Sequence, residues 1–134
     1  MKKLLFAVPV LACVMGGCAT PQEPFQPRAD HIPIEQYPQI TTTYELSRYL
    51  VIARPSVNHD GVLRVNVPVR MTSRPGEWAK VQYRFMFLDA QGVPLKVQPD
   101  WQPVTLEPQQ QVFMSGNAMD SNAVDWRLEI RSQR

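Results

Sequence analysis

The side chains that could do chemistry in this chain are carboxylates, because histidines and thiols are scarce. His31 lies in a proline-rich stretch and His59 in a tight turn, so nucleophile–histidine triads lack parts. No glycine-rich phosphate loop and no metal-ligand spacing is present. A glycan-cleaving site would need two carboxylates about 5–9.5 Å apart. The candidates in the strand-rich half are Asp89, Asp100, Asp120, Asp125 and Glu129.

Two of these acids lie at positions where aspartate usually has a structural role. Asp89 and Asp120 occupy turn-like contexts, in which an aspartate side chain ordinarily caps the backbone. The remaining acids show no pairing in the sequence that would favour general acid–base chemistry. We therefore predict a protein that is not an enzyme and uses no cofactor or metal.

Arginine is the main cation of the strand-like segments. Five arginines alternate with apolar residues there: Arg64, Arg70, Arg84, Arg127 and Arg131. Guanidinium groups fork carboxylates, stack on aromatic rings and are enriched at interfaces. Such a row is either a solvated face paired to acids or a docking surface, and Trp78 and Trp101 are either lids on the core or anchors. We predict that Arg70 and Arg84, with Trp78 nearby, bind an envelope protein or glycan.

The N-terminal segment has the features of an export signal. Lys2 and Lys3 precede an apolar run over residues 4–15, which is too short to remain as a membrane span. Gly16-Gly17-Cys18 follows and resembles a lipobox, the processing site of bacterial lipoproteins. The resemblance implies cleavage before Cys18 and acylation of its thiol and amine, and several acyl chains anchor a protein stably. An ordinary secretory signal with an incidental cysteine is the alternative.

The residue after the cysteine influences which membrane such a lipoprotein is sorted to. In enterobacterial-type lipoproteins an aspartate there favours the inner membrane, whereas this chain has Ala19. The resemblance thus implies an outer-membrane lipoprotein facing the periplasm. Loss of residues 1–17 lowers Lys+Arg from 14 to 12 and leaves Asp+Glu at 12. The mature net charge therefore gives no support to a nucleic-acid partner, and Cys18 alone leaves no disulfide.

The mature chain divides into a tether at 18–43 and a β domain at 44–134. Proline and glutamine recur through the first part and favour an extended spacer. The second part predicts short strands at 46–54, 63–72, 79–88, 101–106, 111–114 and 124–130, with a hairpin at Asp60-Gly61. Pro68 predicts that its strand lies at a sheet edge or is bulged. This pattern predicts a small immunoglobulin-like antiparallel sandwich of about six or seven strands, with a closed barrel as the alternative.

The segment 79–88, which we predict to be the central strand, and the closing strand at 124–130 also carry a family resemblance. Residues 81–92, 115–118 and 126–130 resemble the YcfL-like bacterial lipoproteins. The resemblance implies a periplasm-facing, immunoglobulin-like lipoprotein without an assigned reaction, and an association with peptidoglycan synthesis. We therefore expect a membrane-anchored, non-catalytic binding module with an envelope or peptidoglycan-associated partner. A pilot lipoprotein of a secretion apparatus and a carboxylate-dependent glycan hydrolase are the alternatives.

Overall fold

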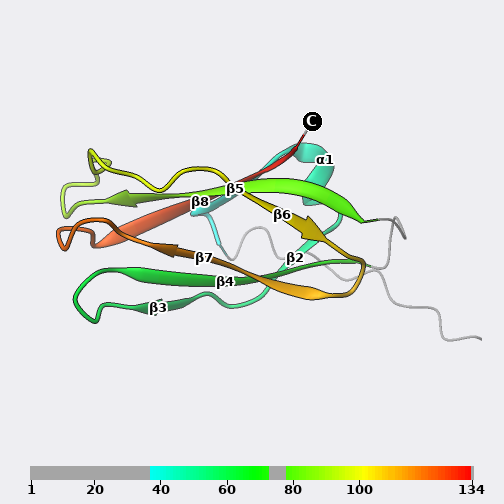
Figure 1. Cartoon of the computed structure of the whole chain (residues 1–134), viewed down its shortest axis with the longest axis horizontal. Coiled ribbons are helices and arrows are strands. Elements are labelled where there is room, and N and C mark those ends of the chain that lie inside the picture. The colour runs from blue at the N-terminus through cyan, green and yellow to red at the C-terminus, as the bar shows by residue number, and fades with distance from the viewer. Residues whose placement is uncertain (1–36, 73–77, 134) are drawn as a thin grey trace, which may run out of the picture.

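The computed structural model describes residues 37–72 and 78–133 of the 134-residue chain. These residues form a sandwich of two layers of strands (Figure 1). Its elements are β1 (Ile40–Thr42), α1 (Tyr44–Ser47), β2 (Leu50–Ile52), β3 (Ser56–Asn58), β4 (Arg64–Met71), β5 (Ala79–Leu88), β6 (Gln102–Leu106), β7 (Gln111–Asn117) and β8 (Asp125–Ser132). The predicted all-β sandwich is confirmed, with eight strands instead of six or seven.

One layer, sheet A, has the strand order β1-β8-β5-β6. β5 pairs antiparallel with β8 over eight residue pairs, from Val81 opposite Ser132 to Leu88 opposite Asp125. β1 departs from the antiparallel expectation, since it pairs parallel with β8. The predicted central strand is confirmed, because β5 lies between β8 and β6.

The other layer, sheet B, is built around β4. β7 pairs with one edge of β4, and β2 and β3 share the other edge. The Asp60-Gly61 hairpin is confirmed: Gly61 has a φ of 83°, and the Asn58 side chain accepts a hydrogen bond from the Asp60 N–H at 2.9 Å. A positive φ is accessible to glycine without a side-chain clash, which suits this turn.

Pro68 lies in the middle of a sheet, so the prediction of an edge strand is wrong. β4 has strands on both sides, but the strand on one side is interrupted opposite Pro68, where β2 ends and β3 has not begun. The Pro68 carbonyl still accepts a hydrogen bond from Ala53 N–H at 2.9 Å. Proline has no backbone N–H to donate, and at Pro68 this absence faces the interrupted side, where no strand requires the hydrogen bond.

The core fills the space between the inward phases of the two sheets. On β5, the Tyr83, Phe85 and Phe87 rings follow one another, with centroids 6.1 and 6.0 Å apart. Trp126 of β8 lies 5.9 Å from Phe85 and is buried, as the sequence predicts. Gly116 of β7 leaves room for Phe85, because a Cβ there would clash with that ring. The two layers are therefore in close contact at Phe85.

The start of the domain differs from the prediction in two places. β1 falls inside the range predicted as a tether, and it pairs with residues 128–130 of β8. The predicted strand at 46–54 is wrong in its first half, because α1 and a turn precede β2. The chain must pass here from sheet A to sheet B, and one helical turn that buries only Leu46 makes the crossing. Within the described ranges, no helix has the length and apolarity to cross a membrane.

Candidate functional site

The best-formed surface for a ligand is the outer face of sheet A, meaning the side chains of β5 and β8 that point away from sheet B. Strand alternation puts every second residue there. On β5 these residues are half-buried or exposed, while their neighbours Val81, Tyr83, Phe85 and Phe87 are buried. The face comprises Lys80, Gln82, Arg84 and Met86 of β5 and Asp125, Arg127, Glu129 and Arg131 of β8. It is the polar phase of β5 and β8, which pair over more residues than any other two described strands.

An ion pair and an aromatic ring hold Arg84 on this face. Arg84 and Glu129 are directly opposite in the β5–β8 register, and Arg84 Nη2 lies 3.1 Å from Glu129 Oε2. The guanidinium carbon of Arg84 also lies 4.6 Å from the centre of the Trp101 ring. Contacts on two sides restrict the rotamers that this arginine can adopt.

Trp101 is a shared platform for two arginines. The Arg131 guanidinium carbon lies 3.7 Å from the ring centre, closer than that of Arg84. Arg131 also donates a hydrogen bond to Gln82 Oε1 at 3.2 Å. Trp101 therefore does not cover an end of the core, as one sequence alternative held, and instead lies against the arginines of the outer face.

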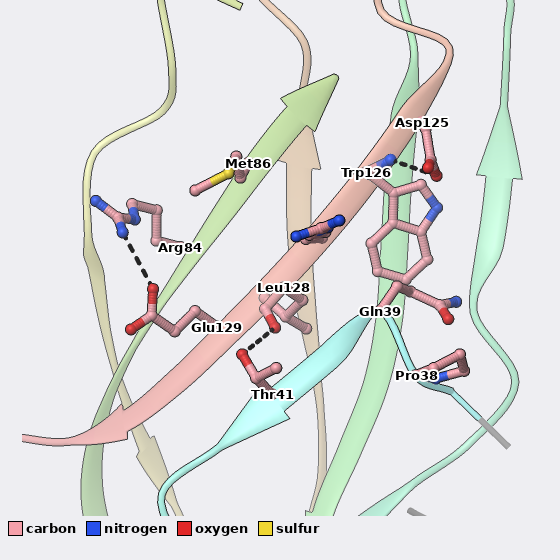
Figure 2. A pocket seen from close by; sticks show the side chains of 10 residues that line it. Pro38, Gln39, Thr41, Arg84, Met86, Asp125, Trp126, Leu128 and Glu129 are labelled. Carbon is pink, nitrogen blue, oxygen red and sulfur yellow. Dashed lines mark hydrogen bonds and ion pairs between the residues drawn. The ribbon is translucent and has the colours of Figure 1, made fainter. Parts of the chain in front are cut away.

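A hollow of about 760 Å³ opens beside this cluster (Figure 2). Its rim is formed by Pro38, Gln39 and Thr41, and its floor by Arg84, Met86 and residues 125–129 of β8. The hollow exists because β1 is short: β1 pairs with residues 128–130, and residues 125–127 of β8 have no β1 partner. The volume falls in the range of small-ligand pockets.

The acids of the hollow are already engaged. Glu129 pairs with Arg84, and Asp125 Oδ1 accepts a hydrogen bond from the Trp126 N–H at 2.8 Å (Figure 2). Arg127, in contrast, is exposed and has no carboxylate within ion-pair distance among residues 37–72 and 78–133. The outer face of sheet A therefore carries uncompensated positive charge.

The structure separates the residues predicted to bind a partner. Arg84 lies on the outer face of sheet A, whereas Arg70 lies on the outer face of sheet B, opposite Gln111 of β7. Trp78 is 61 % exposed at the start of β5, with Lys80 Nζ 5.5 Å from its ring centre. Cys18 lies outside the described residues. No single face thus holds both Arg70 and Arg84.

Four of the five candidate catalytic acids have a hydrogen-bond or ion-pair partner, and the fifth, Asp100, is exposed. Asp89 Oδ1 accepts the N–H groups of Gln91 and Val93 at 2.9 Å, as expected for a turn cap. Asp120 Oδ1 caps the N–H of Asn122 in the same way. Asp125 and Glu129 share a face and stand four positions apart on β8, roughly 13 Å at the backbone, and each carboxylate already has a partner. Among the described residues, no group of three or more His, Cys, Asp or Glu side chains could hold a metal ion.

Tyr83 joins the two sheets at the edge of β7. Its hydroxyl accepts a hydrogen bond from the Ser115 backbone N–H and donates one to Gln102 Oε1 at 2.7 Å. Burial raises the pKa of Tyr83 above its usual value, and the Ser115 hydrogen bond opposes this shift. The hydroxyl occupies a donor of the β7 edge, which an unblocked edge strand would offer to another chain.

The sequence prediction names Arg127 in the row of arginines and Trp101 as a possible anchor, but it selects neither as a partner-binding residue. A signal for Arg127 was present, because 124–130 alternates as clearly as 79–88 does. The pairing of Met86 with Arg127 and of Arg84 with Glu129 places these residues together. Trp101 lies before β6, and only the folded contacts reveal that it stacks on arginines from two other strands.

Solved structures contain the same fold. The crystal structure of Campylobacter jejuni cj0090 aligns with a TM-score of 0.60 and 25 % identity, over 71 % of this chain and 98 % of that one. The crystal structure of a DUF1425 family member from Shewanella sp. pv-4 aligns with a TM-score of 0.52 and 20 % identity, over 63 % of this chain and 77 % of that one. No curated protein sequence matches.

A family match covers the described domain almost from end to end. The matching family is described as "Protein of unknown function (DUF1425)", and it spans residues 39–132. The match begins one residue before β1 and ends at the last residue of β8. The chain belongs to the DUF1425 family.

Proposed function

We propose that this chain is an outer-membrane lipoprotein, anchored through acylated Cys18 and facing the periplasm, whose sandwich is a non-catalytic binding module. The leader, the lipobox-like Gly16-Gly17-Cys18 and Ala19 support the anchor and the address. Within the family, the resemblance of residues 81–92 to YcfL-like proteins supports a link to peptidoglycan synthesis. The partner is an envelope protein or a peptidoglycan-associated component.

The observation that carries the binding role is the organisation of the outer face of sheet A. Arg84 is fixed between Glu129 and Trp101, and Arg131 stacks on the same ring. Arg127 stands beside them with its charge uncompensated by any described residue. Arginine and tryptophan are the side chains that most often dominate binding energy at interfaces. The acids nearby serve the fold or the ion pair, which supports binding without catalysis.

The test is cross-linking of cells that express the full chain, followed by affinity capture. Arg84→Glu/Arg127→Glu reverses two charges on the outer face of sheet A, and we expect it to abolish capture of the main partner. Arg64→Glu/Arg70→Glu is the matched control on the outer face of sheet B, and we expect it to retain capture. Circular dichroism and thermal melting check that both variants fold. Equal capture by both variants would refute the assignment of the face.

The identity of the captured protein separates the two kinds of accessory role. Synthase-type partners support the peptidoglycan link, whereas secretin or ring components support a secretion pilot. The anchor is tested by metabolic labelling with a fatty acid, which we expect to mark the wild-type chain and not Cys18→Ala. A purified protein that retains residues 1–17 and carries no lipid would overturn the anchoring.

A further inference from the structure

We propose that the hollow beside β1 binds the carboxylate of an extended peptide, and that Arg127 is the side chain that receives it. This inference rests on the proposed binding role of the outer face of sheet A and names the chemistry of its partner. It follows from the charges, the register and the lining of the hollow.

The two arginines of the hollow differ in how far they are satisfied. Arg84 already binds a carboxylate, with 3.1 Å between its Nη2 and Glu129 Oε2, and it rests against Trp101. Arg127 is exposed and lines the same hollow, yet no described carboxylate lies within ion-pair distance of it. Asp125, two residues away on the same face, is bound to the Trp126 N–H. One guanidinium is thus held in place by partners, and the other keeps its charge-assisted donors for a ligand.

The register brings these arginines close enough to act on one anion. Glu129 is opposite Arg84 and Met86 is opposite Arg127, so the two arginines are diagonal neighbours on paired strands. Diagonal neighbours lie roughly 7–8 Å apart at the backbone, within reach of long side chains. Like charges this close repel, and Glu129 neutralises only one of them. A bound anion would neutralise the other.

The rest of the lining suits a peptide. The apolar side chains that face the hollow are Met86 and Pro38, which offer contact for an aliphatic side chain. Gln39 presents its amide at the rim (Figure 2), where it makes no hydrogen bond to another described side chain or backbone group. A primary amide can both donate to and accept from a peptide backbone. Planar guanidinium groups bind carboxylates in a bidentate manner, which gives orientation as well as affinity.

The short β1 strand explains how an extended segment could lie here. β1 reaches only residues 128–130 of β8, so residues 125–127 have β5 on one side and no described strand on the other. The hollow continues along this stretch. A peptide lying in it would follow β8, with its carboxylate at Arg127 and an apolar side chain over Met86.

The experiment titrates the isotope-labelled full chain with three probes and follows its NMR spectra. The probe peptide is acetyl-Ala-Leu-Glu, which carries two carboxylates; acetyl-Ala-Leu-Gln-amide carries none; inorganic phosphate supplies an anion without a peptide. We expect saturable shifts at residues 39–41, 84–87 and 125–129 with the first probe at up to about 10 mM, which detects millimolar binding. We expect at least tenfold weaker binding of the amide and of phosphate.

Matched variants assign the carboxylate to its arginine. Arg127→Gln should weaken peptide binding at least tenfold, and Arg64→Gln, an exposed arginine on the outer face of sheet B, should leave it unchanged. Equal binding of the acid and amide peptides, equal binding of phosphate, shifts elsewhere on the domain, or no shift at all would each overturn the inference. Should the peptide fail while Arg84→Glu/Arg127→Glu still abolishes capture from cells, the peptide-carboxylate inference falls and the proposed binding face stands.

Discussion

The outer faces of the two sheets are both formed by the outward side chains of alternating strands, but these side chains contact one another differently on the two faces. On sheet A the polar phase carries Arg84, Glu129 and Arg131, which are joined through an ion pair and the Trp101 ring. On sheet B the exposed Phe113 stands opposite Pro68, and Ser115 Oγ donates to Asn66 Oδ1 at 2.8 Å. No carboxylate occupies a strand position on that face among the described residues.

The difference between the two faces comes from strand pairing, which the alternation of polar and apolar residues does not determine. Alternation gives each strand a polar side, but it does not decide which polar side chains will meet. In sheet A, the register of two long strands places opposite charges directly across from each other. In sheet B, the arginines of β4 lie opposite the uncharged Gln111 and Asn117 of β7. Strand pairing therefore decides which outward side chains contact one another.

The largest expected loss of stability comes from a substitution between the two sheets, because it would disturb the packing of both. Gly116→Ala pushes a methyl group into the Phe85 ring where the two layers touch. Overpacking of this kind costs about 1–3 kcal/mol of unfolding free energy, measured by urea denaturation. Gln111→Ala, on the same strand and exposed, should change stability by less than about 0.5 kcal/mol. Partial recovery in Gly116→Ala/Phe85→Leu would identify the clash as the cause, and a fully stable Gly116→Ala would contradict the layer contact.

The next effect tests the hydroxyl that joins the layers. Tyr83→Phe leaves the Ser115 N–H without its acceptor and should cost about 1–3 kcal/mol. Tyr44→Phe is the matched control, because Tyr44 is 74 % exposed. Urea denaturation at neutral pH measures both, and equal stabilities would show that water replaces the Tyr83 hydroxyl.

The same residue predicts a dependence on pH. Burial raises the pKa of Tyr83 above 10.0, so the folded state holds this proton more tightly than the unfolded state does. Its contribution is complete below pH 10 and is lost as the pH rises through the folded-state pKa. As the pH rises above 10, the wild type should therefore lose more stability than Tyr83→Phe. Parallel losses in the two proteins would argue against this linkage.

A smaller effect separates the aromatic residues of the two faces. Trp101→Ala removes the ring on which two arginines rest and should cost about 1–2 kcal/mol, at about 0.5–1 for each contact. Phe113→Ala removes a ring that is 56 % exposed and should cost less than about 0.5 kcal/mol. Thermal melts of both variants measure the contrast. Similar losses would remove the distinction between the faces.

The smallest effect concerns the ion pair. Glu129→Gln removes the Arg84 partner, and exposed pairs contribute about 0.2–1 kcal/mol. The loss should shrink in about 1 M salt, where the Debye length falls to about 3 Å. Glu107→Gln, an exposed acid outside the strands, is the control. A loss that salt leaves unchanged would indicate packing instead of charge.

Much of the architecture could be predicted because its strands are long and alternate. β4, β5 and β8 all follow apolar phases with period two, and the hairpin before β4 has its turn glycine. β1 could not be predicted, since three residues after a proline-rich stretch carry no period. Its stability comes from pairing with β8, whose residues lie 88 positions further along the chain.

The candidate site was predictable only within single strands. The polar phase of 79–88 placed Arg84 outward, and that of 63–72 placed Arg70 outward. Which sheet each strand joins depends on long-range pairing, so a common face for the two could not be inferred from either pattern. Trp101 stands outside any strand, and its contacts with Arg84 and Arg131 depend on where β6 docks.

The position of β1 has a consequence for how the domain is held. Tyr37 is the first described residue, and its carbonyl accepts the Ile40 N–H at 3.0 Å; the next two residues border the hollow. The first residues of the described domain and the proposed ligand site therefore share one corner of the molecule. A ligand seated there would contact residues 38 and 39 as well as β8, so binding would oppose the separation of β1 from β8.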